Sequence, residues 1–151
     1  MQNIIYSEAN EADIADLVRL LSVLFSIEKD FNADLAKQQK GLELLLKNNA
    51  TASMQVARNG AGKAVGMVSA QLVVSTAQGA TSAWVEDMVL DAAYRGHGIG
   101  KQLLHNALTW AKNKGATRAQ LLVDVENIDA VGYYQHLNWE ATQLQARRVF
   151  L

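Results

Sequence analysis

The residues that can do chemistry in this chain of 151 residues gather in one stretch, 84–101. It starts with an apolar run that contains the acidic pair Glu86 and Asp87, and it continues into Arg95 and three alternate glycines. The apolar run predicts a buried strand, and the glycines predict a tight turn that opens a helix. Backbone N–H groups at the start of a helix bind anions, and glycine leaves those groups accessible. The stretch therefore predicts an anion site, most often a phosphate site, close to two carboxylates.

Two phosphate-binding motifs fit these glycines poorly. A dinucleotide-binding fingerprint has the spacing Gly-x-Gly-x-x-Gly, whereas the glycines here stand at 96, 98 and 100. A P-loop has Ser or Thr after its lysine, whereas Lys101 is followed by Gln102. A glycine-rich turn that binds nothing stays open as an alternative on these residues alone.

Composition narrows the class of protein. Half of the residues are hydrophobic and 19% are charged, which is ordinary for one soluble globular domain, residues 1–151. The net charge of −1 gives no reason to expect a nucleic-acid partner, and the absence of cysteine excludes disulfides and a cysteine nucleophile. The three histidines share no metal-ligand spacing, so we expect no metal. No signal peptide is visible, and no apolar stretch approaches the roughly 18 residues of a membrane span. We expect a cytoplasmic enzyme or binding module with no membrane contact.

Hydrophobic periodicity predicts helices that alternate with a mixed sheet, which is typical of an α/β or α+β domain. The nearly continuous apolar run 119–123 indicates a parallel strand that is buried on both faces. Asn10 is an expected N-cap, and a helix should end at Lys114 and Gly115. The predicted strands are 3–7, 54–58, 65–74, 83–90, 119–123, 140–144 and 147–150, and the predicted helices begin after Asn10, at Leu35, at the glycines and at 127.

Two motifs resemble the GNAT superfamily of N-acetyltransferases. Residues 95–100, Arg-Gly-His-Gly-Ile-Gly, are similar to its Arg/Gln-x-x-Gly-x-Gly/Ala signature. Residues 127–139 are similar to its Asn-x-x-Ala-x-x-aromatic-Tyr-x-x-x-Gly-aromatic segment, with Asn138 in place of the glycine. Asn also tolerates the left-handed backbone that glycine adopts, so this departure is mild. The resemblance covers essentially the whole chain. It implies a mixed, mostly antiparallel sheet with a splayed pair of parallel strands, flanked by about four helices.

The resemblance implies acetyl-CoA as co-substrate. Its pyrophosphate would bind the N–H groups of the glycine turn, and its pantetheine arm would lie along the strand before that turn. One N–H of that strand could polarise the thioester carbonyl. The residues that would contact acetyl-CoA are Met88, Val89, Leu90, Arg95, Gly96, His97, Gly98, Ile99, Gly100, Lys101, Asn127, Ala130 and Tyr134.

The resemblance also implies catalytic roles. Tyr134 matches the family tyrosine that protonates the departing thiolate, and Glu86 would be the base, directly or through water. The acidic pair is similar to that of the spermidine/spermine (diamine) branch, which lines the polyamine site. Successive strand residues face opposite sides, so at most one of Glu86 and Asp87 would easily share the acceptor cavity. A solvated or salt-bridged strand end is the alternative for both. We expect Glu86, Asp87 and Glu28 to bind the acceptor.

These observations predict direct transfer of an acetyl group to a primary amine, a small cationic amine or a polyamine. Two alternatives stay open. One is a non-catalytic module that binds acyl-CoA as a sensor, and the other is an acetyltransferase that acts on a protein lysine or N-terminus. By analogy with the family, a homodimer could complete the acceptor cavity, and residues 147–150 are one place where it could form.

Overall fold

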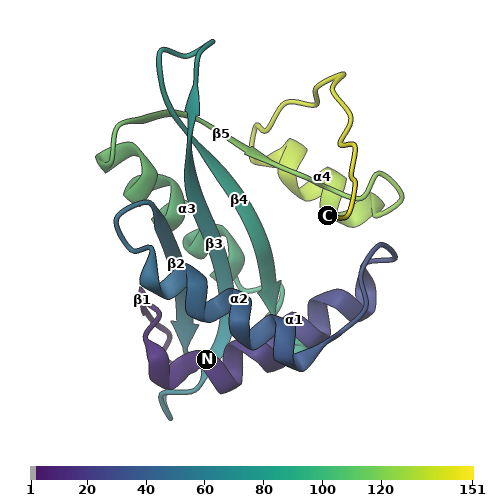
Figure 1. Cartoon of the computed structure of the whole chain (residues 1–151). Helices are drawn as coiled ribbons and strands as arrows, with labels where there is room; N and C mark the ends of the chain where they lie inside the picture. The colour runs from purple at the N-terminus through teal and green to yellow at the C-terminus, as the bar shows by residue number, and fades with distance from the viewer. Residues whose placement is uncertain (1–2) are drawn as a thin grey trace. The chain divides into compact units, whose positions relative to one another are not determined.

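The computed structural model describes residues 3–151 (Figure 1), and their contacts divide the chain into two compact units. The first unit ends at Gln120, and the second is Leu121–Leu151. The first unit holds a five-stranded sheet of order β1-β2-β3-β4-β5, and the second unit holds helix α4. The elements are β1 (Ile5–Glu8), η1 (Glu11–Asp13), α1 (Ile14–Ile27), α2 (Leu35–Lys47), β2 (Ala52–Arg58), β3 (Ala64–Ser75), β4 (Ala80–Leu90), η2 (Ala92–Tyr94), α3 (Ile99–Asn113), β5 (Ala116–Leu121) and α4 (Ile128–His136).

The sheet is mixed, as predicted. Strands β1 to β4 pair antiparallel in chain order. Helix α3 then carries the chain back, so that β5 starts beside the start of β4. There the Arg118 Nε donates to the Ser82 Oγ over 3.2 Å, and the Thr117 hydroxyl donates to the Gln78 side-chain oxygen over 2.9 Å. Because the two strands start at the same end, β5 runs parallel to β4.

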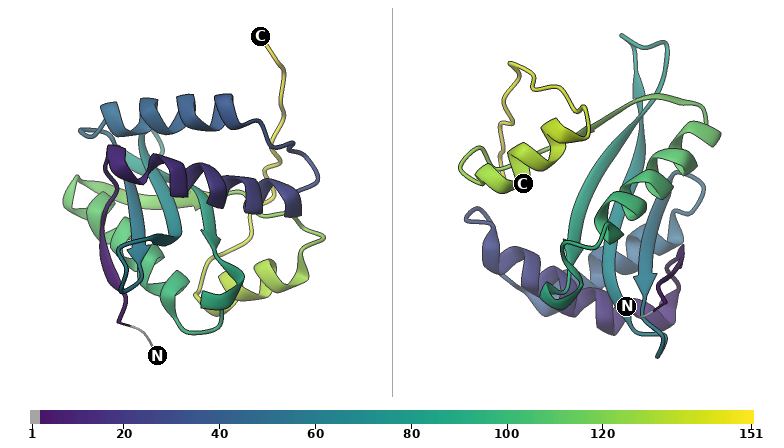
Figure 2. Two further views of the ribbon diagram at one scale, coloured as in Figure 1. Left: turned by 90° about the horizontal axis from the view of Figure 1, so that it is seen from below. Right: turned by 180° about the vertical axis from the view of Figure 1, so that it is seen from behind.

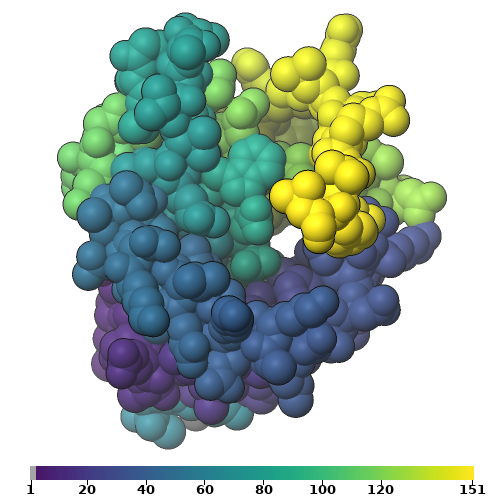
Figure 3. Space-filling view, in the orientation of Figure 1, coloured from purple at the N-terminus to yellow at the C-terminus, as the bar shows by residue number. Residues whose placement is uncertain are grey.

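Helices cover both faces of the sheet in the first unit. Figure 2 shows α1 and α2 together on one face and α3 on the other. The hydrophobic periodicity that predicted these helices agrees with their packing, since Leu17, Leu21 and Leu42 are buried on one side and Leu103 and Ala107 on the other. The β3–β4 hairpin projects beyond α1 and α2 (Figure 3). Val73 and Val74 at the end of β3 are accordingly exposed, while Ser82 and Ala83 of β4 are still buried.

The start of the helical layer is held by a buried ion pair. Asn10 caps η1 as predicted, in a capping box with Asp13. The Asp13 carboxylate also accepts two hydrogen bonds from the Arg58 guanidinium at the end of β2. Burial alone would raise the pKa of Asp13, but the hydrogen bonds from Arg58 and Asn10 and the charge of Arg58 outweigh it and lower that pKa. The pair joins the sheet to the first helix.

Three sequence predictions about the last third of the chain are wrong. Residues 140–144 and 147–150 form no strand, and Leu144, Val149 and Phe150 are at least 80% exposed. An alternating pattern needs a neighbouring strand, and within the described second unit none is present. The strand predicted at 119–123 ends at Leu121, and no residue of β5 is buried, because β5 is the edge of the sheet.

Within residues 3–151, no helix combines the length and the apolar composition that crossing a bilayer requires.

Candidate active site

A β-bulge interrupts β4 at Asp87 and Met88, directly after Glu86. Glu86 and Val89 of β4 pair with Ser69 and Met67 of β3, so two residues of β4 lie opposite a single residue of β3. Asp87 adopts φ +57°, in the left-handed region that non-glycine residues rarely visit and that Asp and Asn enter most readily. The expectation that Glu86 and Asp87 face opposite sides assumed a regular strand. That alternation does not hold at a bulge.

The carboxylates of Glu86 and Glu28 influence the pKa of Asp87 in the bulge. Burial, followed by the negative charges of Glu86 and Glu28, together raise the pKa of Asp87 to about 7. Glu28 is the C-cap that follows the last residue of α1, so the carboxylates come from two segments far apart in the sequence. The structure thus brings together the acidic trio Glu28, Glu86 and Asp87 that the sequence selected. Sequence reasoning missed the raised pKa of Asp87.

Trp84 positions the exposed side chain of Glu86. The indole Nε1 of Trp84 donates a hydrogen bond to a carboxylate oxygen of Glu86, two residues further along the strand. The hydroxyl of the buried Ser69 donates to the backbone oxygen of Glu86 over 3.1 Å. Residues two apart on a strand share a face, and this spacing is the sequence signal that could have linked Trp84 to Glu86.

The glycine turn presents an uncapped helix start. Gly98 is the N-cap of α3 with φ +79°, and Gly96 has φ +77°. No side chain hydrogen-bonds to this start, whereas Asp34 caps α2 and Asn127 caps α4. A Cβ at position 96 or 98 would meet no atom within 4 Å, so the turn is open to a ligand. The first N–H groups of a helix lack partners inside it, and an anion can bind them.

The glycine turn has one side that is buried in the protein and one that is exposed to solvent. Ile99 and Gly100 are buried, while His97 and Lys101 are exposed. The site predicted from the glycines therefore has an apolar base and an open, positively polarised rim, which fits the pyrophosphate of a coenzyme.

Arg95 joins the turn to the end of β4. Its Nε and one Nη donate to the backbone oxygen of Leu90 over 3.2 and 3.1 Å. The next residue, Asp91, accepts a hydrogen bond of 2.5 Å from Arg19 of α1 and donates its N–H to the Val65 oxygen over 2.8 Å. Arg95 and Leu90 were both predicted to contact the coenzyme, and here they contact each other. These bonds hold the end of β4 in place before the glycine turn.

The second motif forms the start of α4 in the second unit. Asn127 accepts a hydrogen bond from the Ala130 N–H over 3.1 Å, so the predicted contact residues Asn127 and Ala130 define the helix N-terminus. Asn138 follows the helix with φ +67°, which agrees with its place at a family glycine.

Tyr134 lies on α4 in an aromatic cluster. Its ring packs edge-on against Tyr133 and Trp139, with centroid separations of 5.4 and 5.9 Å. Burial raises the pKa of the neighbouring Tyr133. Edge-to-face packing orients the Tyr134 ring within its own unit, as a positioned hydroxyl requires.

Comparison with known proteins assigns these features to a family. The sequence profile of the acetyltransferase (GNAT) family matches residues 15–139, which include both motifs. The chain belongs to this family. An uncharacterized N-acetyltransferase of Methanocaldococcus jannaschii is 32% identical over 84 residues, a segment that is 55% of this chain and 37% of that relative. The chain thus matches little more than a third of that relative's length.

Solved structures share the GNAT fold over nearly the full chain. A transcriptional regulator from Bacillus halodurans C-125 superposes with a TM-score of 0.82 at 26% identity, covering 98% of this chain and 100% of that one. An aminoglycoside N-acetyltransferase in complex with CoA superposes with a TM-score of 0.79 at 18% identity, covering 100% of this GNAT chain and 95% of that one. These matches confirm the predicted fold class.

We expect Asp87→Asn to stabilise the protein in a pH-dependent way. Asn keeps the left-handed backbone, so the substitution removes only the charge. The pKa of Asp87 is about 7 in the fold, against about 3.9 in an unfolded chain, so the folded state retains a proton that the unfolded state releases. The stability that Asp87 provides is present at low pH and is lost as the pH rises through its folded pKa. The Tm of D87N should therefore exceed that of the wild type at about pH 8 and match it at about pH 4.

The exposed Asp30 provides a control for this measurement. Asp30→Asn should show no Tm difference that grows through neutral pH. A D87N difference that stays constant from acid to alkaline pH would show that Asp87 is an ordinary surface carboxylate.

Proposed function

We propose that this chain is an acetyl-CoA-dependent N-acetyltransferase that transfers an acetyl group directly to a primary amine. The observation that carries the proposal is the arrangement along β4. A carboxyl group with a pKa of about 7, that of Asp87, lies in the bulge, and the uncapped start of α3 at Gly98 follows the end of the same strand. An anion site and a proton acceptor matched to neutral pH are the two things that acetyl transfer from a coenzyme to an amine needs.

The chain's own residues would hold acetyl-CoA at the glycine turn. The N–H groups from Gly96 to Lys101 would bind the pyrophosphate, and the backbone of Met88 and Val89 would bond to the pantetheine arm. Acetyl-CoA supplies an electrophilic acyl carbon and a thiolate that can leave. The CoA complex of the aminoglycoside N-acetyltransferase with the same fold supports this assignment.

The acidic trio would bind and activate the acceptor. An alkylammonium has a pKa of about 10.4, so Glu28 and Glu86 attract it as a cation and a base must then remove its proton. We assign that proton to Asp87, because its pKa of about 7 matches the operating pH better than a fully ionised carboxylate would. The neutral amine nitrogen then bonds to the acyl carbon, and the carbon–sulfur bond breaks. Tyr134 gives its proton to the departing thiolate, and the second proton that the nitrogen loses as it becomes an amide restores the Tyr134 hydroxyl. Negative charge at the acceptor end makes cationic amines, polyamines among them, the expected substrates.

A non-catalytic acyl-CoA sensor is the second candidate, because one structure with this fold is a transcriptional regulator. The titratable Asp87 favours an enzyme, since a sensor has no use for a base at this position. An acetyltransferase of protein lysines or N-termini would share the same chemistry. The cytoplasmic location and the homodimer stay predictions.

The proposal predicts that free coenzyme A appears when the protein is given acetyl-CoA and a suitable primary amine. Thiol release should be measured with polyamines, aminoglycosides, amino acids and short peptides, each with and without the protein. Release with small amines but not with peptides favours the small-molecule enzyme over the protein acetyltransferase. Coenzyme binding without thiol release from any acceptor would favour the sensor.

The assignment of the base predicts a pH profile. We expect kcat/KM of the wild type to rise with pH and to level off above the pKa of Asp87, about 7. In D87N that step should disappear and kcat should fall by about two to four orders of magnitude, the usual contribution of a general base. Glu86→Gln should instead keep a step and move it to lower pH, because removing the Glu86 charge lowers the pKa of Asp87. The opposite pattern, with the step lost in E86Q and kept in D87N, would return the role of base to Glu86.

Tyr134→Phe tests the proton donor. We expect kcat to fall by about a hundredfold or more, while the Kd of acetyl-CoA, measured by calorimetry, changes little. Tyr133→Phe on the same helix is the matched control and should keep most of the activity. A Y134F variant that loses coenzyme binding as much as turnover would reassign Tyr134 to packing.

A further inference from the structure

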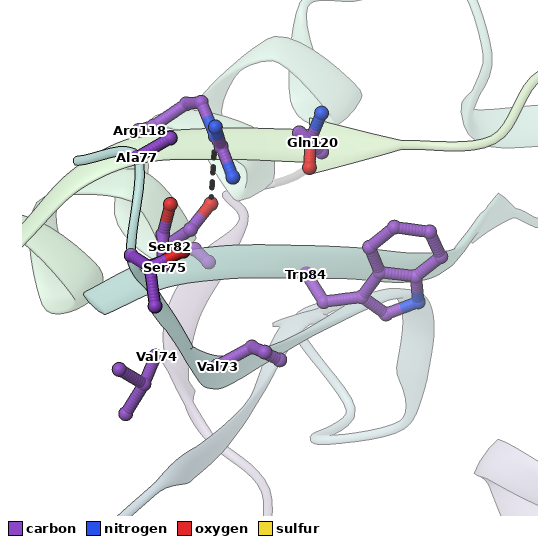
Figure 4. A pocket seen from close by; sticks show the side chains of 10 residues that line it. Val73, Val74, Ser75, Ala77, Ser82, Trp84, Arg118 and Gln120 are labelled. Carbon is purple, nitrogen blue, oxygen red and sulfur yellow. Dashed lines mark hydrogen bonds between the residues drawn. The ribbon is translucent and has the colours of Figure 1, made fainter. Parts of the chain in front are cut away.

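A cavity lies on the first unit's sheet, between the start of β4 and the start of β5. It has a volume of about 350 Å³, and the β3–β4 hairpin closes one side of it. Figure 4 shows Arg118 and Gln120 reaching into it from β5, opposite Ser82 and Trp84 of β4. Neither the glycine turn nor the acidic trio lines this cavity. Its remaining lining residues are Val73, Val74, Ser75, Thr76, Ala77 and Ala83.

Arg118 gives this cavity a single positive charge. Its side chain is half-buried, and its Nε donates to the Ser82 Oγ over 3.2 Å. Within residues 3–151, no carboxylate pairs with Arg118, and Ser82 is the one hydrogen-bond partner that it has. Both Nη groups therefore remain available as donors. A guanidinium withdrawn from water is normally paired with an anion, and its fork of N–H groups matches the two oxygens of a carboxylate.

Trp84 connects the cavity to the acidic trio. Its indole lines the cavity, and its Nε1 is bonded to Glu86. Ser82, Trp84 and Glu86 pair with alternate residues of β3, so all three side chains lie on one face of the sheet. Ser82 and Glu86 are four residues apart, and four residues of strand span about 13 Å. The guanidinium that is bonded to Ser82 and the carboxylate of Glu86 are therefore separated by a distance on this scale. One face of β4 thus has the Arg118 cation of β5 beside its start, negative charge near its end and an aromatic ring between them.

We propose that Arg118 binds a carboxylate at the far end of the acceptor whose amine lies at the acidic trio. The inference rests on the proposed function and names its substrate class. The acceptor is an extended amino carboxylate with an apolar middle against Trp84. Its charged groups are separated by a distance on the order of 10 Å, the scale that the four residues of strand set. The lone cation fits a carboxylate, with one negative charge, better than a phosphate monoester with nearly two. A polyamine would place an ammonium beside Arg118, and that repulsion disfavours the substrate class that the acidic pair alone predicts.

Three amines of equal chain length test this inference. The probes are 8-aminooctanoate, octylamine and 1,8-diaminooctane, which end in a carboxylate, a methyl group and an ammonium. We expect kcat/KM to be highest for 8-aminooctanoate and lowest for the diamine. A charge-assisted hydrogen bond corresponds to about a ten- to hundredfold preference for 8-aminooctanoate over octylamine.

Variants at Arg118 assign that preference to the cavity. Arg118→Gln should abolish the preference, and Arg118→Glu should reverse it in favour of the diamine. Ser82→Ala removes the hydrogen bond to Arg118 but keeps the charge, so most of the preference should survive. Arg148→Gln, at an exposed arginine of the second unit, is the matched control and should keep the whole preference. Circular dichroism confirms that each variant is folded.

Calorimetry separates this inference from the proposed function. The Kd of 8-aminooctanoate is measured with coenzyme A present, so that no transfer occurs, for the wild type and R118Q. If amines are acetylated but the carboxylate gives no advantage, or R118Q keeps the advantage, the carboxylate site is wrong and the enzyme stands. If no amine is acetylated but 8-aminooctanoate binds only when Arg118 is present, the carboxylate site is supported and the proposed acetyltransferase activity is wrong. Binding that is absent or insensitive to Arg118, without turnover, overturns both.

Discussion

The left-handed backbone at Asp87 is the constraint on which the arrangement of the site depends. Most residues avoid φ +57°, and one that adopts it inside a strand adds a residue that the neighbouring strand does not match. The extra residue breaks the regular alternation of side chains and brings the Asp87 carboxyl under the influence of Glu28 and Glu86. Without the bulge, β4 would continue as a regular antiparallel partner of β3. The environment of the Asp87 carboxyl therefore depends on the left-handed backbone at that residue.

Strand β4 then orders the charged groups from one end to the other. It starts beside Arg118, passes Trp84 and the acidic trio, and ends where Arg95 and Asp91 fasten it ahead of the glycine turn. A strand is stiff along its length, so groups placed on it keep their separations. Along β4 the sign of the neighbouring charge alternates: Arg118 of β5 is positive beside its start, the acidic trio is negative at the bulge, and the start of α3 beyond its end is positively polarised. Such an order would suit the proposed transfer, in which a charged coenzyme and a charged acceptor meet at the bulge.

Local patterns predicted the features that depend on near neighbours. The buried face of α3 followed from helical periodicity, and the left-handed Gly98 followed from the need for glycine where a turn opens a helix. The proton affinity of Asp87 could not be predicted in the same way, because it depends on Glu28 in another element. No sequence pattern signalled Arg118, which precedes an apolar run. Its place in the cavity depends on Ser82, which lies on the neighbouring strand and is distant in the sequence. The two false strands after α4 show the same limit, because alternation does not reveal whether a partner strand exists.

The uncapped start of α3 has a consequence for the life of the protein in a cell. The side chain of Asp34 caps the N-terminus of α2, whereas no side chain of the described residues caps the N-terminus of α3. A ligand that binds only the folded state adds RT ln(1 + [L]/Kd) to the free energy of unfolding, about 2.7 kcal/mol when the ligand is at a hundred times its Kd. An anion that completes α3 therefore also sets how often the chain unfolds and how quickly proteases degrade it. The abundance of this protein would then follow the supply of its own coenzyme.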